Sequence, residues 1–394
     1  TTDKGSLADA CEDADVFIGL SGPDLMTPEM LKSMAPKPVV FALSNPNPEI
    51  KPELAKATRD DVIMANGRGG FSINKGIEGS GGNRKQESDA LALWIKDDIS
   101  WGALTVSPGL RYEYIDQSYT DYEANSKNTR TGGGSGTLET LAPGIGLTYD
   151  VGDYNTIFAG VFKGYSIPAP RSRIKSGTDP EESIGYELGF RHRKDAFAAE
   201  FAGFFTDFDN LISSDAGLGG SDSTNAGEAE VYGIEAAVSY DPAMDAGMTF
   251  KTPIYVSATW THAELTKALS SGGGDNIYAG AFAGSEIPYV PEWKLAAGVG
   301  FSTEKWGVNL DATYTNDMFG TAANLSTPSS SSRQGKIDSS LLVDFSAHYR
   351  VTENVKLIGG IHNLFDETVV VSRLPEGPRV GAPRQLYVGF EMAF

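Results

Sequence analysis

The lengths of the connections between successive strand-like segments constrain this chain more than any other feature of its sequence. After residue 88, short polar turns alternate without exception with long segments rich in Gly, Ser, Asn and Asp. An outer-membrane β-barrel has short turns at one rim and long loops at the opposite rim. A soluble β-sandwich has no reason to sort its connections in this way. The alternation therefore favours an antiparallel barrel that crosses a membrane.

The connections divide this part of the chain into thirteen expected strands. The strands are expected near 89–99, 102–115, 138–150, 155–165, 183–194, 196–209, 227–240, 253–266, 288–302, 306–318, 338–350, 355–366 and 384–394. The short turns are expected at 100–101, 151–154, 195, 241–245, 303–305 and 351–354. The long connections are expected at 116–137, 166–182, 210–226, 267–287, 319–337 and 367–383. Strands of about 10–14 residues are long enough to cross a bilayer at a tilt.

Within the expected strands, apolar side chains recur at every second residue. In the last strand Leu386, Val388 and Phe390 alternate with Tyr387 and Glu391. Successive side chains of a strand point to opposite faces, so each strand presents one apolar face and one polar or mixed face. Aromatic residues crowd the strand ends, as they do in the girdles of membrane barrels. A soluble β-rich binding module with half-buried sheets is the alternative that this pattern leaves open.

Charge and cysteine content exclude several other classes. The formal net charge is −20 at pH 7, which argues against a nucleic-acid partner because phosphate backbones select basic surfaces. Cys11 is the one cysteine of the chain, so an internal disulfide is impossible. No apolar run approaches the roughly 18 residues of a transmembrane helix. The start of the chain has no basic and apolar leader, so we expect no signal peptide there.

Residues 1–69 differ from the remainder and are expected to form a small α/β, Rossmann-like fragment. Strands are expected at 14–20, 38–43 and 61–65, and helices at 27–34 and 52–57. The second strand is apolar on both faces, as a parallel sheet requires. Thr27 and Pro28 have the N-cap and first-turn pattern of a helix start. The Gly- and Ser-rich residues 70–88 are expected to link this fragment to the strands at 89–394.

The first segment resembles the NAD-binding domain of malic enzyme. The resemblance covers about residues 5–68 and rests on the stretches ADVFIGLSGPDLMTPEMLKSMAPKPVVFALSNPNPEI and RDDVIMANGR. It implies that Ser21 and Asn45 would lie beside the nicotinamide and the malate. The glycine-rich turn that binds the pyrophosphate is not found upstream, and neither are the family's catalytic Tyr and Lys or its metal-binding acids. We therefore expect an incomplete NAD site, no cofactor, no catalytic residues and no enzymatic activity.

The strands at 89–394 resemble the barrel of TonB-dependent outer-membrane receptors. Five motifs occur in the order of that family: PGLRYE at 108–113, VYGIE at 231–235, IPYVP at 287–291, GIHNLFD at 360–366, and a terminal strand that ends on Phe394. The stretch SDALALW at 88–94, followed by PGLRYEYID, looks most like the ferric-dicitrate subgroup. The resemblance covers about 83–394. It implies a place in the cell outer membrane and uptake of a ferric chelate, either ferric citrate or a siderophore.

The same resemblance implies partners and raises a difficulty. The partners are outer-membrane lipids and lipopolysaccharide, the barrel-assembly machinery that would read Phe394, and TonB. A plug domain and a TonB box, which the intact family has, are not found. Thirteen strands in a meander would leave the first and last strands parallel, and open edges in lipid leave costly unsatisfied backbone groups. We expect a partial barrel, truncated and not competent for transport alone.

Long connections contribute the candidate ligand-binding residues. A ferric chelate of the citrate type is anionic, so planar cationic donors are expected to bind it. The candidates are Arg171, Arg173, Arg333, Arg373 and Arg379. They are alternatively solvated loop charges or ligands for lipopolysaccharide phosphates. The four histidines lie on four different strands without ligand spacing, and the acidic loop residues are expected to be solvated, so no metal site is predicted.

Two readings from different functional classes follow. In the first, the chain is a truncated receptor barrel for an iron chelate behind a malic-enzyme fragment. In the second, the first 69 residues define a malic enzyme, which decarboxylates malate oxidatively, and the barrel was joined to it artificially. The strands are the more complete part, because the enzyme segment retains no pair of catalytic residues, and this favours the receptor.

Overall fold

The computed structural model describes most of the chain and divides it into two compact units. The described residues are 6–19, 24–42, 48–66, 71–73, 84–123, 129–213, 223–268, 276–374 and 377–392. One unit comprises Thr1–Lys85 and Tyr119–Gly133, and the other comprises Gln86–Ser118 and Gly134–Phe394. The first contains the α/β segment, and the second contains most of a long β-sheet.

The α/β segment has the predicted parallel arrangement. Its elements are α1 (Leu7–Cys11), β1 (Val16–Gly19), α2 (Pro28–Ser33), β2 (Val39–Ala42), α3 (Pro52–Thr58), β3 (Ile63–Asn66) and β4 (Phe71–Ile73). Strands β1, β2 and β3 are neighbours in that order and pair in parallel. The sequence reading missed helix α1 and strand β4, which pairs with β3 in the antiparallel direction.

The predicted helix start and the buried face explain why this segment folds locally. The Thr27 hydroxyl accepts a hydrogen bond from the backbone N–H of Met30 at 3.3 Å, and Pro28 occupies the first turn. This is the N-cap pattern that satisfies an otherwise unpaired helical donor. The core between helices and sheet is formed by Cys11, Met26, Leu31, Met34, Val40, Ala42, Ile50, Ala55, Val62 and Met64.

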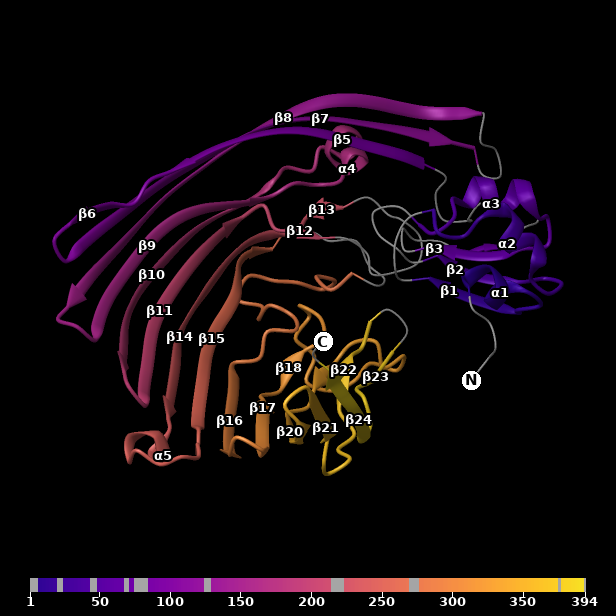
Figure 1. The fold of residues 1–394 in the computed structure, drawn as a ribbon. Coiled ribbons are helices and arrows are strands. Elements are labelled where there is room, and N and C mark those ends of the chain that lie inside the picture. The colour runs from indigo at the N-terminus through magenta and orange to yellow at the C-terminus, as the bar shows by residue number, and fades with distance from the viewer. Residues whose placement is uncertain are drawn as a thin grey trace. The chain divides into compact units, whose positions relative to one another are not determined.

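The long sheet contains all thirteen predicted strands in the predicted order. They are β5 (Arg84–Lys96), β7 (Leu104–Tyr122), β8 (Arg130–Val151), β9 (Asn155–Ser166), β10 (Glu181–Lys194), β11 (Phe197–Asp209), β14 (Gly227–Tyr240), β15 (Ile254–Ala268), β16 (Trp293–Ser302), β17 (Trp306–Thr315), β20 (Ser340–Thr352), β21 (Val355–His362) and β24 (Gln385–Met392). Each strand pairs with its chain neighbour along the sheet. From β8 to β24 every neighbouring pair is antiparallel, and the strands lie side by side as a curved wall (Figure 1).

The sheet is open, as the odd strand count predicted. Among the described strands, β5 and β24 end the hydrogen-bonded path, and each has one neighbour on it. A fourteenth strand, β6 (Ile99–Trp101), pairs with β7 beside this path. It is the continuation of the expected strand 89–99 after a break at Asp97 and Asp98. The Asp97 N–H donates to the carbonyl of Pro108, a residue that has no N–H to return.

Several predicted boundaries differ from the structure: the strand expected at 288–302 begins only at Trp293, and the strand expected at 355–366 ends at His362. Two connections show the physical reasons. The first hairpin turns at Gly102 and Ala103 rather than at 100–101, because Gly102 supplies the left-handed backbone (φ 60°) that a tight turn needs. The long connection expected at 116–137 is only 123–129, because β7 and β8 extend into it. Tyr and Thr residues near the end of β7 favour extended backbone and override the polar, turn-like composition.

Register shows that the sheet has two chemically different faces. Leu188 and Phe190 of β10 lie opposite Gly203 and Phe201 of β11, whereas Arg191 lies opposite Glu200. We call the side that bears Leu188, Phe201 and Ile234 the apolar face, and the side that bears Arg191 and Glu200 the polar face. Leu188 and Ile234 are 62% and 57% exposed, so the apolar face presents large apolar side chains that no other part of the described structure covers.

Candidate functional site

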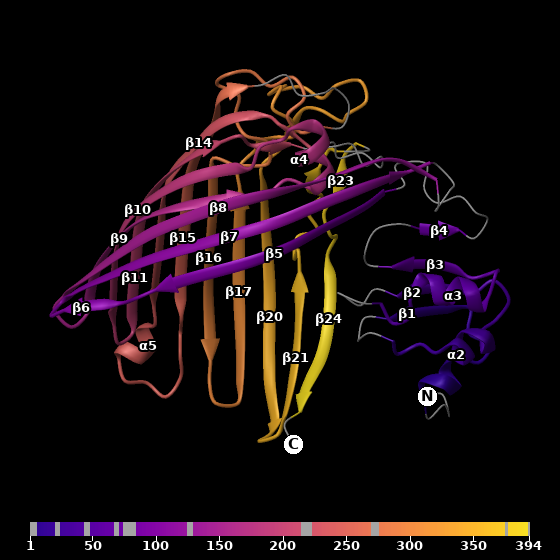
Figure 2. The same cartoon turned by 90° about the horizontal axis from the view of Figure 1, so that it is seen from above.

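Long connections gather at one rim of the sheet and short turns at the other (Figure 2). The long-connection rim carries α4 (Pro170–Ser176) and the strand pairs β12 (Ile212–Ser213) with β13 (Thr224–Asn225), β18 (Met318–Phe319) with β19 (Lys336–Ile337), and β22 (Val370–Ser372) with β23 (Arg379–Val380). The short-turn rim carries α5 (Pro242–Asp245). We call the described residues of the connections 167–180, 210–226, 276–292, 316–339 and 363–384 the loop layer.

Asparagine side chains join neighbouring connections of the loop layer. The Asn225 carboxamide accepts from the Asp179 N–H at 2.9 Å and donates to the carbonyls of Asp179 at 3.0 Å and Asn210 at 2.8 Å. The side-chain Oδ1 of the buried Asn276 accepts from the Ser213 hydroxyl at 2.7 Å and from the Tyr278 N–H at 2.8 Å. Each amide therefore replaces a backbone partner that an irregular segment would otherwise lack.

An apolar cluster lies beneath these amides. Leu211, Ala226, Leu265, Tyr278 and Ala322 are buried together, although they come from different connections and strand ends. Burial raises the pKa of the Tyr278 hydroxyl, and the charge of Glu181 adds to this effect. The layer thus has a small core of its own, which favours one arrangement of the connections over many.

Arg373, one of the predicted ligand-binding residues, is buried within the loop layer. Its side chain is 7% exposed, and its guanidinium donates to the carbonyl of Lys336 at 2.9 and 2.7 Å and to that of Ser332 at 3.3 Å. The Tyr289 hydroxyl accepts from the Arg373 N–H at 3.3 Å. In this structure the guanidinium holds two connections together, and a ligand would have to displace those carbonyls to reach it.

The other predicted arginines lie in more open positions. Arg379 on β23 and Arg333 are exposed, and Arg171 and Arg173 on α4 are half-buried. The Arg173 guanidinium lies 3.7 Å from the Asp179 carboxylate, and its Nε is buried without a hydrogen-bond partner among the described residues. The sequence grouped these arginines by loop membership; the structure distributes them over α4, the β18–β19 connection and β23.

A second buried polar cluster lies on the polar face beside α4. Gln117 of β7 is 1% exposed, and its amide donates to the Pro168 carbonyl at 3.2 Å, at the start of the connection that carries α4. Its Oε1, like the hydroxyl of Thr140 on β8, has no hydrogen-bond partner among the described residues. The connection after β9 therefore folds over the polar face, which lies on the concave side of the sheet (Figure 1).

Lower on the polar face, aromatic rings lie against glycines of the neighbouring strand. The pairs are Phe158 with Gly189, Phe162 with Gly185, Phe204 with Gly233, Tyr255 with Gly298, His348 with Gly307, and Tyr387 with Gly360. A glycine leaves room for the ring to lie along the sheet, and the ring covers the exposed backbone. The sequence reading missed these pairs because they are visible only once the register is known.

Three predicted residues lie outside the described residues: Ser21 and Asn45 of the α/β segment and the terminal Phe394. Among the residues that the structure does describe, no group of three or more His, Cys, Asp or Glu side chains is arranged to hold a metal ion. Within the same residues, no helix combines the length and the apolar character needed to cross a membrane.

Comparison with known proteins identifies relatives of the long sheet. Residues 55–364 match the family model "TonB dependent receptor-like, beta-barrel". The unliganded ferric citrate transporter FecA superposes with a TM-score of 0.67 at 21% identity, over 82% of this chain and 47% of that one. The siderophore receptor PiuA from Acinetobacter baumannii superposes with a TM-score of 0.64 at 18% identity, over 78% and 44%. The chain spans about half the length of these solved structures.

Comparison by sequence finds a different family, the malic enzymes, which match only part of this chain. An NADP-dependent malic enzyme of Halomonas elongata is 64% identical over 119 residues, which are 30% of this chain and 28% of that protein. The NADP-dependent malic enzyme of Escherichia coli K12 is 50% identical over 68 residues, or 17% of this chain and 9% of that protein. The chain thus spans less than a third of the malic enzymes to which it is similar.

Proposed function

The chain belongs to the TonB-dependent receptor-like β-barrel family, and we propose that residues 89–394 are the barrel part of an outer-membrane receptor for a ferric chelate. The observation that carries the proposal is the separation of chemistry in one sheet. Exposed apolar side chains cover one face, the other face carries ion pairs and hydroxyl groups among aromatic rings and glycines, and hydrogen-bonded connections form a layer at one rim. The partial barrel is not proposed to transport by itself.

The apolar face supports a place in the outer membrane. Side chains such as Leu188 and Ile234 would cost free energy in water but are stable against lipid tails. We propose outer-membrane lipids and lipopolysaccharide as the surroundings of this face. The barrel-assembly machinery is the proposed reader of the terminal strand and Phe394, and TonB is the proposed energy-coupling partner of the whole receptor to which this barrel part belongs.

The loop layer is the proposed capture site. Two of the solved structures that resemble this chain are named as a ferric citrate transporter and a siderophore receptor, and both cargoes are chelates of iron. An anionic chelate requires cations at this rim, and the exposed Arg379 and Arg333 and the half-buried Arg173 and Arg171 supply them. Arg373 is proposed to act through the connections that it holds in place. The chelate is cargo, and no resident cofactor is proposed.

Residues 1–69 support a second, separate proposal. They form parallel strands with the helix pattern of an α/β domain, and malic enzymes match part of the chain at up to 64% identity. We propose that they are a fragment of a malic-enzyme NAD-binding domain, with Ser21 and Asn45 at its relic cofactor site and residues 70–88 as the linker. The separation of apolar and polar side chains on the two faces of the long sheet favours a receptor that carries an unrelated segment over an enzyme.

Ferric citrate and a ferric siderophore, titrated separately into the purified chain in detergent, test the capture site. The chain and its Arg379→Gln variant are compared by tryptophan fluorescence. Arg350→Gln, a change of equal charge near the short-turn rim, is the control. We expect Arg379→Gln to weaken binding by about tenfold, the loss of one charged hydrogen bond, and Arg350→Gln to leave it unchanged. Absence of binding by both chelates to the folded protein would refute the capture site.

A further inference from the structure

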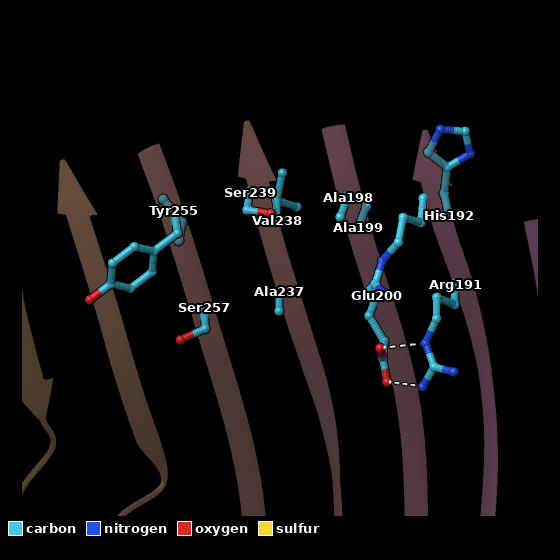
Figure 3. A pocket seen from close by; sticks show the side chains of 12 residues that line it. Arg191, His192, Ala198, Ala199, Glu200, Ala237, Val238, Ser239, Tyr255 and Ser257 are labelled. Carbon is cyan, nitrogen blue, oxygen red and sulfur yellow. Dashed lines mark hydrogen bonds and ion pairs between the residues drawn. The ribbon is translucent and has the colours of Figure 1, made fainter. Parts of the chain in front are cut away.

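A hollow in the polar face lies near the ends of the strands that are joined by short turns, away from the loop layer. It lies where β10, β11, β14 and β15 run side by side and measures about 220 Å³ (Figure 3). Pockets for drug-sized ligands usually measure roughly 300–1,000 Å³, so this hollow accepts only a smaller molecule. The side chains that shape it come from strands whose register is regular, so the hollow is a fixed part of the wall.

Small residues form the floor of the hollow between longer side chains. Along one row of the register, Arg193 lies opposite Ala198, which lies opposite Ser239. The neighbouring row places Ala237 between Glu200 and Ser257. The two alanines contribute only methyl groups, so the arginine at one side and the serine hydroxyls at the other stand above the floor.

The ring of Tyr255 turns away from this space. Tyr255 lies opposite Ser239 in register, but its hydroxyl donates to the Asp311 carboxylate at 2.7 Å and its ring lies against Gly298, on the side away from β14 (Figure 3). The ring therefore borders the hollow without filling it. The same hydrogen bond occupies Asp311, the acidic side chain nearest to the hollow along this row.

The charges of the hollow do not cancel. The Arg191 guanidinium and the Glu200 carboxylate form a two-pronged ion pair at 2.7 and 2.9 Å (Figure 3). Arg193, two residues away on the same face, is exposed, and none of the described residues forms a hydrogen bond or ion pair with its guanidinium. The charge of Arg193 also interacts with Glu200, so two arginines share one carboxylate and leave one net positive charge in the hollow. Two serine hydroxyl groups lie beside them, in a chain whose net charge is −20.

We propose that this hollow binds a small polycarboxylate anion. Arg193 receives one carboxylate in a bidentate contact, and the hydroxyls of Ser239 and Ser257 donate to the remaining oxygens. This rests on the proposed function, because it makes the polar face the wall along which a carboxylate-bearing chelate moves. The loop layer is then the capture site, and the hollow is a second binding site near the opposite rim.

Iron-free citrate is the probe that tests the hollow. It is titrated into the chain of 394 residues in detergent and followed by calorimetry. Arg193→Gln is compared with Lys194→Gln, which removes the same charge from the next residue of β10. Lys194 points to the other face, with its Nζ 4.9 Å from the centre of the Tyr154 ring. We expect Arg193→Gln to weaken citrate binding about tenfold or more and Arg193→Lys to weaken it less. Lys194→Gln is expected to change it less than twofold, and Ser257→Ala tests the hydroxyl contact without changing charge.

Other results of the citrate titration would overturn the proposed anion site. Equal weakening by Arg193→Gln and Lys194→Gln, or no effect of either, overturns the proposal, because binding would then follow overall charge or lie elsewhere. Binding of an end-blocked oligo-aspartate peptide, but not of citrate, in an Arg193-dependent manner would also overturn it and assign the hollow to a polypeptide side chain. The Arg379→Gln titration with ferric chelates is independent, so the capture site and the hollow can fail separately.

Discussion

Arg373 and Arg379 show that two arginines six positions apart can have opposite environments within one connection. Arg379 is exposed on β23, whereas the Arg373 guanidinium is buried against carbonyls of the β18–β19 connection. Composition and loop membership assign both to an anion site, because both are cations in a long connection. The distinction depends on the path of Lys336 and Ser332 through space, and no local sequence signal encodes that path.

Replacement of Arg373 is therefore expected to loosen the loop layer. Arg373→Gln removes the two donors of the Lys336 carbonyl and the buried guanidinium that supplies them, at a cost of roughly 2–3 kcal/mol. Hydrogen exchange of the amides in 316–339 should accelerate, while exchange in β10 and β11 stays unchanged. Arg379→Gln, which removes an exposed charge nearby, serves as the control. Equal exchange in both variants would show that the buried contacts do not hold the layer.

The glycines that lie under aromatic rings are expected to tolerate no larger residue. A Cβ at Gly233 would overlap the Trp260 carbonyl oxygen and the Phe204 ring, so the backbone would have to move. Gly233→Ala is expected to destabilise the sheet by about 1–3 kcal/mol. At Gly203, on the neighbouring strand, the nearest atom to such a Cβ lies 3.9 Å away, so Gly203→Ala is expected to be near neutral. Urea titration of heat-modifiable gel mobility measures both.

The helices α2 and α3 of the α/β segment are joined at their carboxyl ends by one arginine. The Arg59 guanidinium donates to the carbonyls of Leu31 at 3.2 Å and Met34 at 2.8 Å, and it forms two contacts with the Asp61 carboxylate. Carbonyls at the end of a helix lack intrahelical partners, and a cation there also interacts favourably with the helix dipole. Asp61 holds Arg59 in this position and also accepts from the Lys37 N–H at 2.8 Å.

The Asp61 contacts predict acid sensitivity of this element. Hydrogen bonds from Arg59 and then from the Lys37 N–H lower the pKa of Asp61 from 3.8 to about 2. A lowered pKa means that the stabilisation is complete above about pH 4 and is lost as the pH falls from about 4 to 2. The buried Cys11 reports opening through its reaction with 4,4′-dithiodipyridine. We expect faster reaction of the wild type across that window, and Asp61→Asn to react faster already at pH 6 with no step between pH 4 and 2.

Asp15→Asn supplies the matched control, since Asp15 is an exposed acid of the same segment. It should keep the wild-type profile. A step between pH 4 and 2 that survives in Asp61→Asn would assign the acid sensitivity to another carboxylate.

The alternation of apolar and polar residues along the chain predicted the sheet well and the contacts between loops poorly. All thirteen strands of the main path occur in the expected order because each strand carries its own two-residue period and its own turn. The β7–β8 connection was missed because its polar residues still favour extended backbone. The loop layer depends on amides such as Asn225 and Asn276, which also bind partners 15 and 63 residues away, so these contacts could not be predicted from spacing. The capture site and its arginines stay predictions.

Arginine substitutions at Ile234 of β14 and Thr259 of β15 distinguish a membrane barrel from a soluble sheet, because the two hypotheses predict different changes in stability. Ile234 is 57% exposed on the apolar face, and Glu235 lies opposite Thr259 on the polar face. If lipid covers the apolar face, Ile234→Arg costs about 2–4 kcal/mol near the bilayer midplane, and Thr259→Arg costs little. If water covers both faces, Ile234→Arg replaces an exposed apolar side chain and leaves stability unchanged or improves solubility. Urea unfolding of both variants in lipid vesicles, followed by tryptophan fluorescence, should therefore show a large loss for Ile234→Arg alone; equal midpoints would contradict the membrane assignment.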